Sequence, residues 1–111
     1  GRLIKLLKVT KNLKHKCMIS LAYSSGLRIS KVSKLKLKDI DFERKMLHIT
    51  EAKGQKDRYT ILSKNMHILL SSYLKEYQPH YWIFESWTQK RHISIRTIQK
   101  VFEKAKKLII L

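Results

Sequence analysis

Apolar residues recur at three- and four-residue steps in five stretches of the chain, which is the period of one face of an α-helix. The predicted helices cover residues 3–9, 13–23, 29–37, 64–77 and 95–109. Three serines stand where a hydroxyl group can cap the start of a helix; they are Ser30, Ser63 and Ser94. Gly26 follows the second helix, and we expect it to end that helix in the left-handed conformation, which carries no steric penalty at glycine.

Between the third and fourth predicted helices the period shortens to two, which is the period of a β-strand. Residues 46–50 alternate in polarity, and residues 58–62 are rich in the β-branched and aromatic side chains that favour strands. A lysine-rich loop containing Gly54 joins these stretches, so we expect an antiparallel hairpin. The tripeptide Asp39-Ile40-Asp41 predicts a turn before the hairpin.

The remaining segments connect the helices. Residues 81–84 form an apolar run after Pro79 and predict a short buried strand or extended segment, whereas residues 85–92 predict a polar loop. The expected fold class is α+β and mainly α, a helical domain with a small antiparallel β-sheet, formed by residues 1–111 as one domain.

The charge of the chain indicates its partner. The 25 Lys and Arg residues outnumber the 8 Asp and Glu residues, which gives a formal net charge of +17. This excess is beyond what solubility requires and predicts a polyanionic partner. No apolar run approaches the roughly 20 residues of a membrane span, and the lysine-studded start does not resemble a signal peptide. Nucleic acid is therefore the expected partner, with an anionic membrane surface as the alternative for the first amphipathic helix.

The usage of cysteine, histidine and glycine argues against several other chemistries. Cys17 is the single cysteine and lies in an apolar helix, which predicts core packing in a reducing compartment, and we expect the cytoplasm. The histidines are scattered and the glycines are isolated, so the sequence contains neither the ligand spacing of a metal site nor a phosphate-binding glycine loop. We predict no metal, no cofactor and no small-molecule substrate.

Arg28 is the first candidate for chemistry, because it stands at the junction between the second and third predicted helices. A guanidinium beside a helix N-terminus is suited to bind a phosphate group. On spacing alone, the alternative is a structural arginine that pairs with a nearby carboxylate.

Two segments of the chain resemble a known family. Residues 22–41, AYSSGLRISKVSKLKLKDID, resemble the first arginine box of the tyrosine recombinase, or phage integrase, family, in which a GLRxSE segment leads to a D-I-D turn. Residues 52–58, AKGQKDR, are similar to the GKGxKxR hairpin of the same family. The resemblance implies the front part of a catalytic domain that binds double-stranded DNA and cleaves it through a phosphotyrosyl intermediate.

The same resemblance assigns roles to individual residues. Arg28 takes the place of the box I arginine, and Lys53 takes the place of the lysine that protonates the leaving 5′ oxygen, with Lys56 as the alternative donor. The resemblance also implies self-assembly on DNA, as in recombinase synapses. We further predict a DNA-binding set of basic residues, for which a solvated helix surface is the alternative; its members are Lys31, Lys34, Lys36, Lys38, Lys56, Arg58 and Arg96.

The chain departs from the family pattern in two respects. Lys31 stands where the family usually has Glu, and a second cation there is expected to loosen Arg28 or to make the site depend on bound phosphate. The second arginine box and the nucleophilic tyrosine are not found, since His92 and Arg96 are four residues apart instead of three and the five tyrosines fit structural positions. We therefore expect no autonomous DNA cleavage, and a non-catalytic basic DNA-binding remnant is the alternative function.

Overall fold

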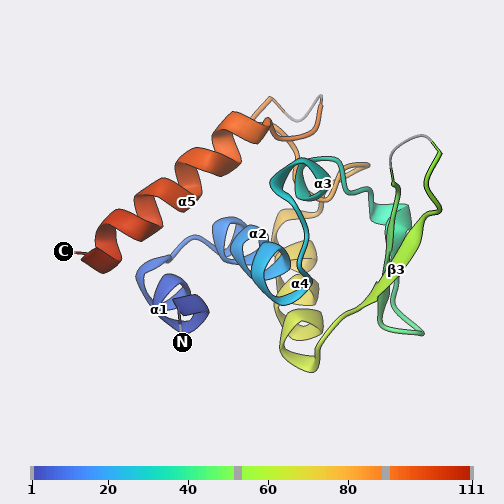
Figure 1. Ribbon diagram of the computed structural model, residues 1–111, viewed down its shortest axis with the longest axis horizontal. Helices are drawn as coiled ribbons and strands as arrows, with labels where there is room; N and C mark the ends of the chain where they lie inside the picture. Colours follow the sequence, from blue (N-terminus) through green and yellow to red (C-terminus); the bar gives the residue numbers. More distant parts are fainter. Residues whose placement is uncertain (1, 52–53, 89–90, 111) are drawn as a thin grey trace.

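Two helices pack side by side at the centre of the fold, α2 (Leu13–Ser24) and α4 (Lys64–Tyr77). The computed structural model describes residues 2–51, 54–88 and 91–110. In Figure 1, α1 (Arg2–Val9) and α5 (Ile95–Ile110) lie on one side of this pair, with both chain ends on that side, and the sheet lies on the opposite side. The short helix α3 (Ile29–Ser33) lies between α5 and the sheet.

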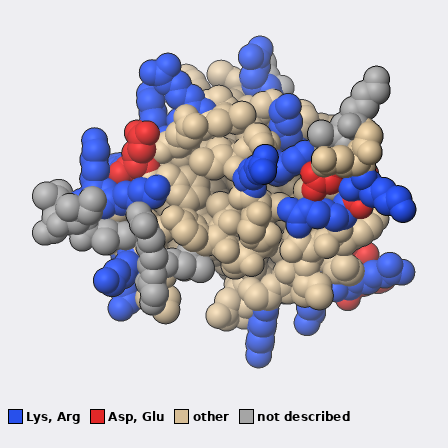
Figure 2. Space-filling view, viewed as in Figure 1, with Lys and Arg blue, Asp and Glu red and all other residues tan. Residues whose placement is uncertain are grey.

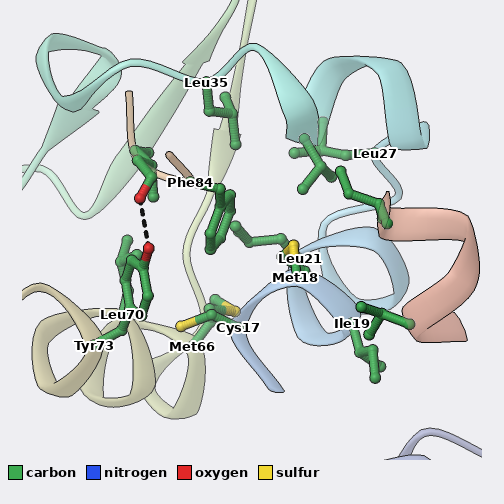
Figure 3. Close-up of a cluster of buried hydrophobic side chains, with 14 of the residues drawn as sticks. Cys17, Met18, Ile19, Leu21, Leu27, Leu35, Met66, Leu70, Tyr73 and Phe84 are labelled. Carbon is green, nitrogen blue, oxygen red and sulfur yellow. Dashed lines mark hydrogen bonds between the residues drawn. The ribbon is translucent and has the colours of Figure 1, made fainter. Parts of the chain in front are cut away.

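The core forms where α2 and α4 face each other and is closed by Phe84 (Figure 3). Cys17 and Met18 of α2 meet Met66 and Leu70 of α4, and all four side chains are buried. Burial of apolar area of this kind is the main favourable contribution to folding. The core therefore fixes the end of α2, and with it the segment that leads to Arg28.

The sheet contains three antiparallel strands in the order β1 (Ile40–Asp41), β2 (Met46–Ile49) and β3 (Arg58–Ile61). Met46 lies opposite Ile61 and Ile49 lies opposite Arg58, which confirms the predicted hairpin. Alternation along β2 buries Leu47 and Ile49 against the helices. The loop between β2 and β3 consequently lies at the outer end of the sheet (Figure 1).

Two of the three predicted caps are confirmed. The Ser63 hydroxyl accepts a 3.1 Å hydrogen bond from the amide of Met66 at the start of α4. The Ser94 hydroxyl accepts a 3.1 Å bond from the amide of Thr97 at the start of α5. Ser30 is not a cap, because α3 already begins at Ile29 and Arg28 occupies the N-cap position.

The predicted helix over residues 29–37 is wrong beyond Ser33. Lys36 is extended, and the chain around it pairs with the segment after α4. The amide of Ile83 donates to the carbonyl of Leu35, and the amide of Leu37 donates to the carbonyl of Tyr81. These backbone bonds between distant segments replace the hydrogen bonds that another helical turn would supply. Within residues 81–84, Trp82 accordingly forms an isolated bridge with Lys36 rather than part of a regular strand, and Ile83 and Phe84 are buried.

The turn predicted at residues 39–41 is also wrong, because residues 40 and 41 form a strand. A 3₁₀ turn, η1 (Leu37–Asp39), precedes β1, so Ile40 and Asp41 belong to the sheet and pair with Leu47 and Met46. The reversal of the chain occurs in the next four residues instead, where Lys45 adopts a positive φ of 55°.

Candidate functional site

Arg28 is positioned by a tight connection between α2 and α3. Ser25 caps the end of α2, and Gly26 follows with a φ of +64°, a left-handed conformation that favours glycine. Leu27 is buried in the core and anchors the connection. The carbonyl of Arg28 then accepts bonds from the amides of Lys31 at 2.9 Å and Val32 at 3.1 Å, which starts α3.

The side chain of Arg28 is exposed, and no described carboxylate lies within ion-pair distance of it. The alternative role predicted for Arg28 was a structural ion pair with a nearby carboxylate. Within residues 2–51, 54–88 and 91–110, Arg28 has no such partner. Because α3 has only five residues, its dipole adds little to an anion site. Any anion bound here would depend on the guanidinium itself.

A hollow of about 310 Å³ lies beside α3, between η1, the end of β2 and residue 82, and we call it the basic hollow. Lys31, Lys34 and Lys36 line it together with His48 and Trp82. Two carboxylates, those of Asp39 and Glu51, also line it and partly balance the lysines. The structure thus brings three of the predicted DNA-binding lysines to one place, although its charge is mixed.

Lys36 lies against aromatic rings at the edge of this hollow. Its ammonium is 5.7 Å from the ring centroids of both Tyr81 and Trp82, which is within the range of a cation–π contact. The Trp82 ring in turn meets the edge of the His92 ring at 5.0 Å. Lys36 is therefore held near the surface rather than left freely solvated.

The segment that carries Trp82 is fastened to α2, α3 and α4. Lys14 of α2 donates a 2.6 Å hydrogen bond to the carbonyl of Glu85, and burial lowers the pKa of the Lys14 ammonium although the Glu85 carboxylate opposes that shift. The buried hydroxyl of Ser33, at the end of α3, donates to the carbonyl of Ile93 and contacts His92 Nδ1 at 3.0 Å. These contacts fix one wall of the basic hollow.

The neck of the hairpin loop is closed by a group of polar contacts. Arg58 Nε donates a 2.8 Å bond to a Glu51 carboxylate oxygen, and the amide of Glu51 donates a 3.1 Å bond to Asp57. His48 Nε2 lies 3.1 Å from Asp57, while its Nδ1 lies 3.4 Å from Asp39. The hydrogen bond from the Glu51 amide, with smaller contributions from His48 and Lys31, lowers the pKa of Asp57.

Lys31 contacts this neck. Its ammonium donates a 2.6 Å bond to the carbonyl of Thr50 and lies 3.9 Å from the Glu51 carboxylate. The charge of Lys31 is therefore partly balanced from the sheet, and its predicted effect on Arg28 stays a prediction.

The other predicted site residues are not gathered into the basic hollow. Lys38, Lys56 and Arg96 are exposed on η1, the hairpin loop and α5, respectively. Lys53, the predicted proton donor, lies outside the described residues. Figure 2 shows Lys and Arg side chains projecting around the outline of the molecule, with the few acidic side chains in view beside basic ones.

The tyrosines occupy positions in which each ring packs against another ring. Tyr73 is buried and stacks on Tyr77 at 4.7 Å, and its hydroxyl donates a hydrogen bond to a backbone carbonyl. Tyr23 meets Phe102 at 6.0 Å, and Tyr59 meets His48 at 5.0 Å. Four of the five tyrosines are nevertheless exposed in part; they are Tyr23, Tyr59, Tyr77 and Tyr81.

Sequence reasoning missed the acidic residues of the hairpin neck. The predicted hairpin indicated only that the two strands pair; the observed register, with Ile49 opposite Arg58, places Glu51 and Asp57 near each other across the neck. The involvement of Lys31 carries no signal in the sequence, since it depends on how α3 is packed against the end of β2.

Metal binding and membrane crossing find no support among the described residues. In residues 2–51, 54–88 and 91–110 there is no group of three or more His, Cys, Asp or Glu side chains that would hold a metal ion. None of the helices in the same part of the chain is long and apolar enough to cross a membrane.

Comparison with known proteins identifies the family. The model of the phage integrase family matches residues 2–109. A putative integrase/recombinase of Sinorhizobium fredii is 40% identical over 73 residues, covering 66% of this chain and 24% of that protein. Tyrosine recombinase XerA of Pyrococcus horikoshii is 31% identical over 103 residues, covering 90% of this chain and 36% of that protein. The chain thus spans about a third or less of the length of these relatives.

Solved structures share the fold. The crystal structure of XerA recombinase superimposes with a TM-score of 0.85 at 20% identity, covering 96% of this chain and 40% of that chain. A lambda integrase dimer bound to a COC′ core site gives a TM-score of 0.76 at 19% identity, covering 98% of this chain and 42% of that chain. The protein belongs to the phage integrase family, whose members include the tyrosine recombinases.

Proposed function

We propose that this chain is the front part of a tyrosine recombinase catalytic domain, that it binds double-stranded DNA, and that Arg28 holds the scissile phosphate. The observation that carries the proposal is the exposed Arg28 guanidinium, which stands at the turn of the family's arginine motif and has no described carboxylate partner. A guanidinium in this state is available for two parallel hydrogen bonds to phosphate oxygens.

The charge of the chain supports DNA as the partner. A formal charge of +17 attracts a polyanion, and exposed lysines neutralise phosphates without reading the base sequence. We assign phosphate contacts to six residues in addition to Arg28; they are Lys34, Lys36, Lys38, Lys56, Arg58 and Arg96. In a reducing cytoplasm, the buried thiol of Cys17 would remain free.

The chemistry that this chain would contribute is charge stabilisation and proton donation. In the proposed reaction a tyrosine oxygen attacks the scissile phosphorus, the bond to the 5′ oxygen breaks, and Lys53 donates the proton that this oxygen takes up. Arg28 stabilises the negative charge on the non-bridging oxygens. The tyrosine and the second arginine box would come from sequence other than residues 1–111.

The dimeric lambda integrase complex supports a further part of the proposal, namely self-assembly on DNA. Fluorescence anisotropy with a duplex labelled at one end would measure binding, and analytical ultracentrifugation of the complex would measure the number of chains on it.

A salt titration tests the DNA proposal directly. We expect log K to fall linearly with log salt, with a loss of at least about 10³-fold between 50 and 200 mM salt if six or more phosphates are contacted. Arg28→Ala should weaken binding to all sequences alike and reduce the slope by about one. The matched control is Lys64→Ala. Lys64 is exposed at the start of α4, which follows the end of β3 opposite to the hairpin loop (Figure 1).

Two outcomes would contradict the proposal. A salt-independent affinity would show that the basic surface is not the contact surface. Equal effects of Arg28→Ala and Lys64→Ala would show that Arg28 has no particular place in the complex. Normal DNA binding by a complete protein that never cleaves DNA would favour the non-catalytic binding module instead.

A further inference from the structure

Lys31 differs from the neighbouring Lys34 in the groups that its ammonium contacts. Its ammonium donates a 2.6 Å hydrogen bond to the carbonyl of Thr50 and lies 3.9 Å from Glu51, so it faces the end of β2. Its side chain is 31% exposed, and that of Glu51 is 19% exposed. Lys34, one helical turn later on the chain, is exposed and has no ion pair with any described acidic residue.

The residues that Lys31 contacts form the neck of the hairpin loop. Glu51 precedes the loop and binds Arg58, which follows it, through a 2.8 Å hydrogen bond. The Glu51 amide also donates to Asp57. Each end of the loop is therefore tied to the other, and Lys31 ties the end at Thr50 and Glu51 to α3.

The same helix carries Arg28 at its N-cap. The amide of Lys31 donates a 2.9 Å bond to the Arg28 carbonyl, so only one turn of backbone separates the arginine from the lysine that contacts the hairpin. An unbroken series of bonds thus links Arg28 through Lys31 to Thr50 and Glu51.

We propose that Lys31 is a positioning residue: its bonds to Thr50 and Glu51 hold the hairpin neck in a fixed place relative to Arg28, and it does not itself contact DNA. This replaces the DNA-binding role predicted for Lys31 from the sequence. Glu51 supplies the carboxylate that offsets this lysine, and it does so from the strand rather than from α3.

The contacts explain why Lys31 is a poor phosphate ligand. To reach DNA its ammonium would have to break the short bond to Thr50 and leave Glu51, whose side chain is only 19% exposed. Lys34 and Lys56 would lose no described ion pair on meeting a phosphate. A benefit of this positioning for DNA cleavage would rest on the proposed function, but the contacts of Lys31 with Thr50 and Glu51, which we call the clamp, do not.

Hydrogen exchange of the free chain tests the clamp without DNA. Lys31→Ala should speed exchange of amides at the hairpin neck, including that of Glu51, by about fivefold, as expected for one partly exposed ion pair with a hydrogen bond. The amide of Ile98 in α5 serves as the internal reference for global stability, because Ile98 is fully buried. Lys31→Arg, which keeps the charge, should restore most of the protection.

A neutral side chain of similar length separates the clamp from a loss of side-chain packing. Lys31→Met keeps most of the aliphatic chain but has no ammonium to donate to Thr50 or to meet Glu51, so it should speed exchange at the neck as much as Lys31→Ala does. Failure of Lys31→Ala to change exchange at the neck would overturn the proposal, as would a Lys31→Met variant with undiminished protection.

DNA affinity provides the second readout. At a fixed low salt concentration, Lys31→Ala should raise the dissociation constant for a non-specific duplex by no more than about twofold, whereas Lys34→Ala should raise it by more. Equal losses for the two variants would make Lys31 a DNA contact and overturn the proposal. If no variant changes DNA affinity, the proposed function fails while the exchange data still decide the clamp.

Discussion

The hydroxyl of Tyr73 on α4 donates a 2.7 Å hydrogen bond to the backbone carbonyl of Ile83, and both residues are buried (Figure 3). This bond fixes the segment that carries Trp82 to the central helix. It also excludes Tyr73 as a nucleophile, because burial raises the pKa of its phenol and the hydroxyl is already engaged.

We predict that Tyr73→Phe lowers the free energy of unfolding by about 1–3 kcal/mol, because it leaves the Ile83 carbonyl buried without a partner. Urea unfolding followed by circular dichroism measures this change. Tyr59→Phe is the matched control, since Tyr59 is 61% exposed, and it should change stability by less than about 0.5 kcal/mol. Similar losses for the two variants would contradict the structural role of the bond.

The turn before Arg28 gives a second prediction. Gly26 has a φ of +64°, and a Cβ atom added there would meet nothing within 4 Å. The cost of Gly26→Ala is therefore conformational, about 1–2 kcal/mol, and Gly26→Asn should cost less because asparagine tolerates the left-handed region. Thermal unfolding of the two variants measures which substitution costs more stability. A stabilising effect of Gly26→Ala would show that the turn is not left-handed.

The single thiol reports on global opening. Burial raises the pKa of Cys17 from its ordinary value of 9.0 to about 12, and the thiolate is the reactive form. At pH 8 we expect alkylation of the native protein to be at least about 10²-fold slower than in denaturant, and its rate should follow the stability of variants such as Tyr73→Phe. Rapid alkylation of the folded protein would contradict the burial of Cys17 against α4.

The hairpin neck should loosen in acid. The folded-state pKa of Asp57 lies below its ordinary value of 3.8, chiefly because its carboxylate accepts a hydrogen bond from the Glu51 amide. The stabilisation is thus fully present above the unfolded-state pKa and is lost as pH falls through the folded-state value. After correction for the intrinsic pH dependence of exchange, protection of the neck amides should be constant above about pH 5 and decline below about pH 4.

Asp57→Asn provides the control for this effect, since the amide side chain does not titrate. The variant should start with weaker protection at neutral pH and lack the decline attributed to Asp57. An undiminished decline in the variant would contradict the assignment of the acid sensitivity to Asp57.

The local features of the fold were predictable because short-range rules determine them. The spacing of apolar residues defines α2, α4 and α5, and the serine caps at Ser63 and Ser94 follow from local hydrogen bonding. The strand β2 follows from the alternation along residues 46–49, of which Leu47 and Ile49 are buried. These elements required no knowledge of distant contacts.

The errors arose where distant segments decide the structure. Lysines and leucines at residues 34–37 suit a helix, but pairing with Tyr81 and Ile83 draws this segment into an extended form. The contact of Lys31 with Glu51 likewise depends on how α3 packs against the sheet. The position of Arg28 was predictable from its motif, whereas the absence of a described carboxylate partner required the structure.

The formation of a covalent protein–DNA adduct tests the central proposal most directly. Residues 1–111 would be joined to a segment with a second arginine box and a tyrosine, either from the native reading frame or from a relative, and mixed with a nicked suicide duplex. We predict that this protein forms adducts, that residues 1–111 alone form none, and that Arg28→Ala slows adduct formation by about 10²-fold or more.

The same assay identifies the proton donor. Lys53→Ala should be slow on the normal duplex but rescued by a bridging 5′ phosphorothiolate, which leaves without a proton. Rescue of Lys56→Ala instead would move the proton donor to Lys56. Adduct formation at an unchanged rate in Arg28→Ala, in a joined protein that cleaves DNA, would contradict the assignment of Arg28 to the scissile phosphate.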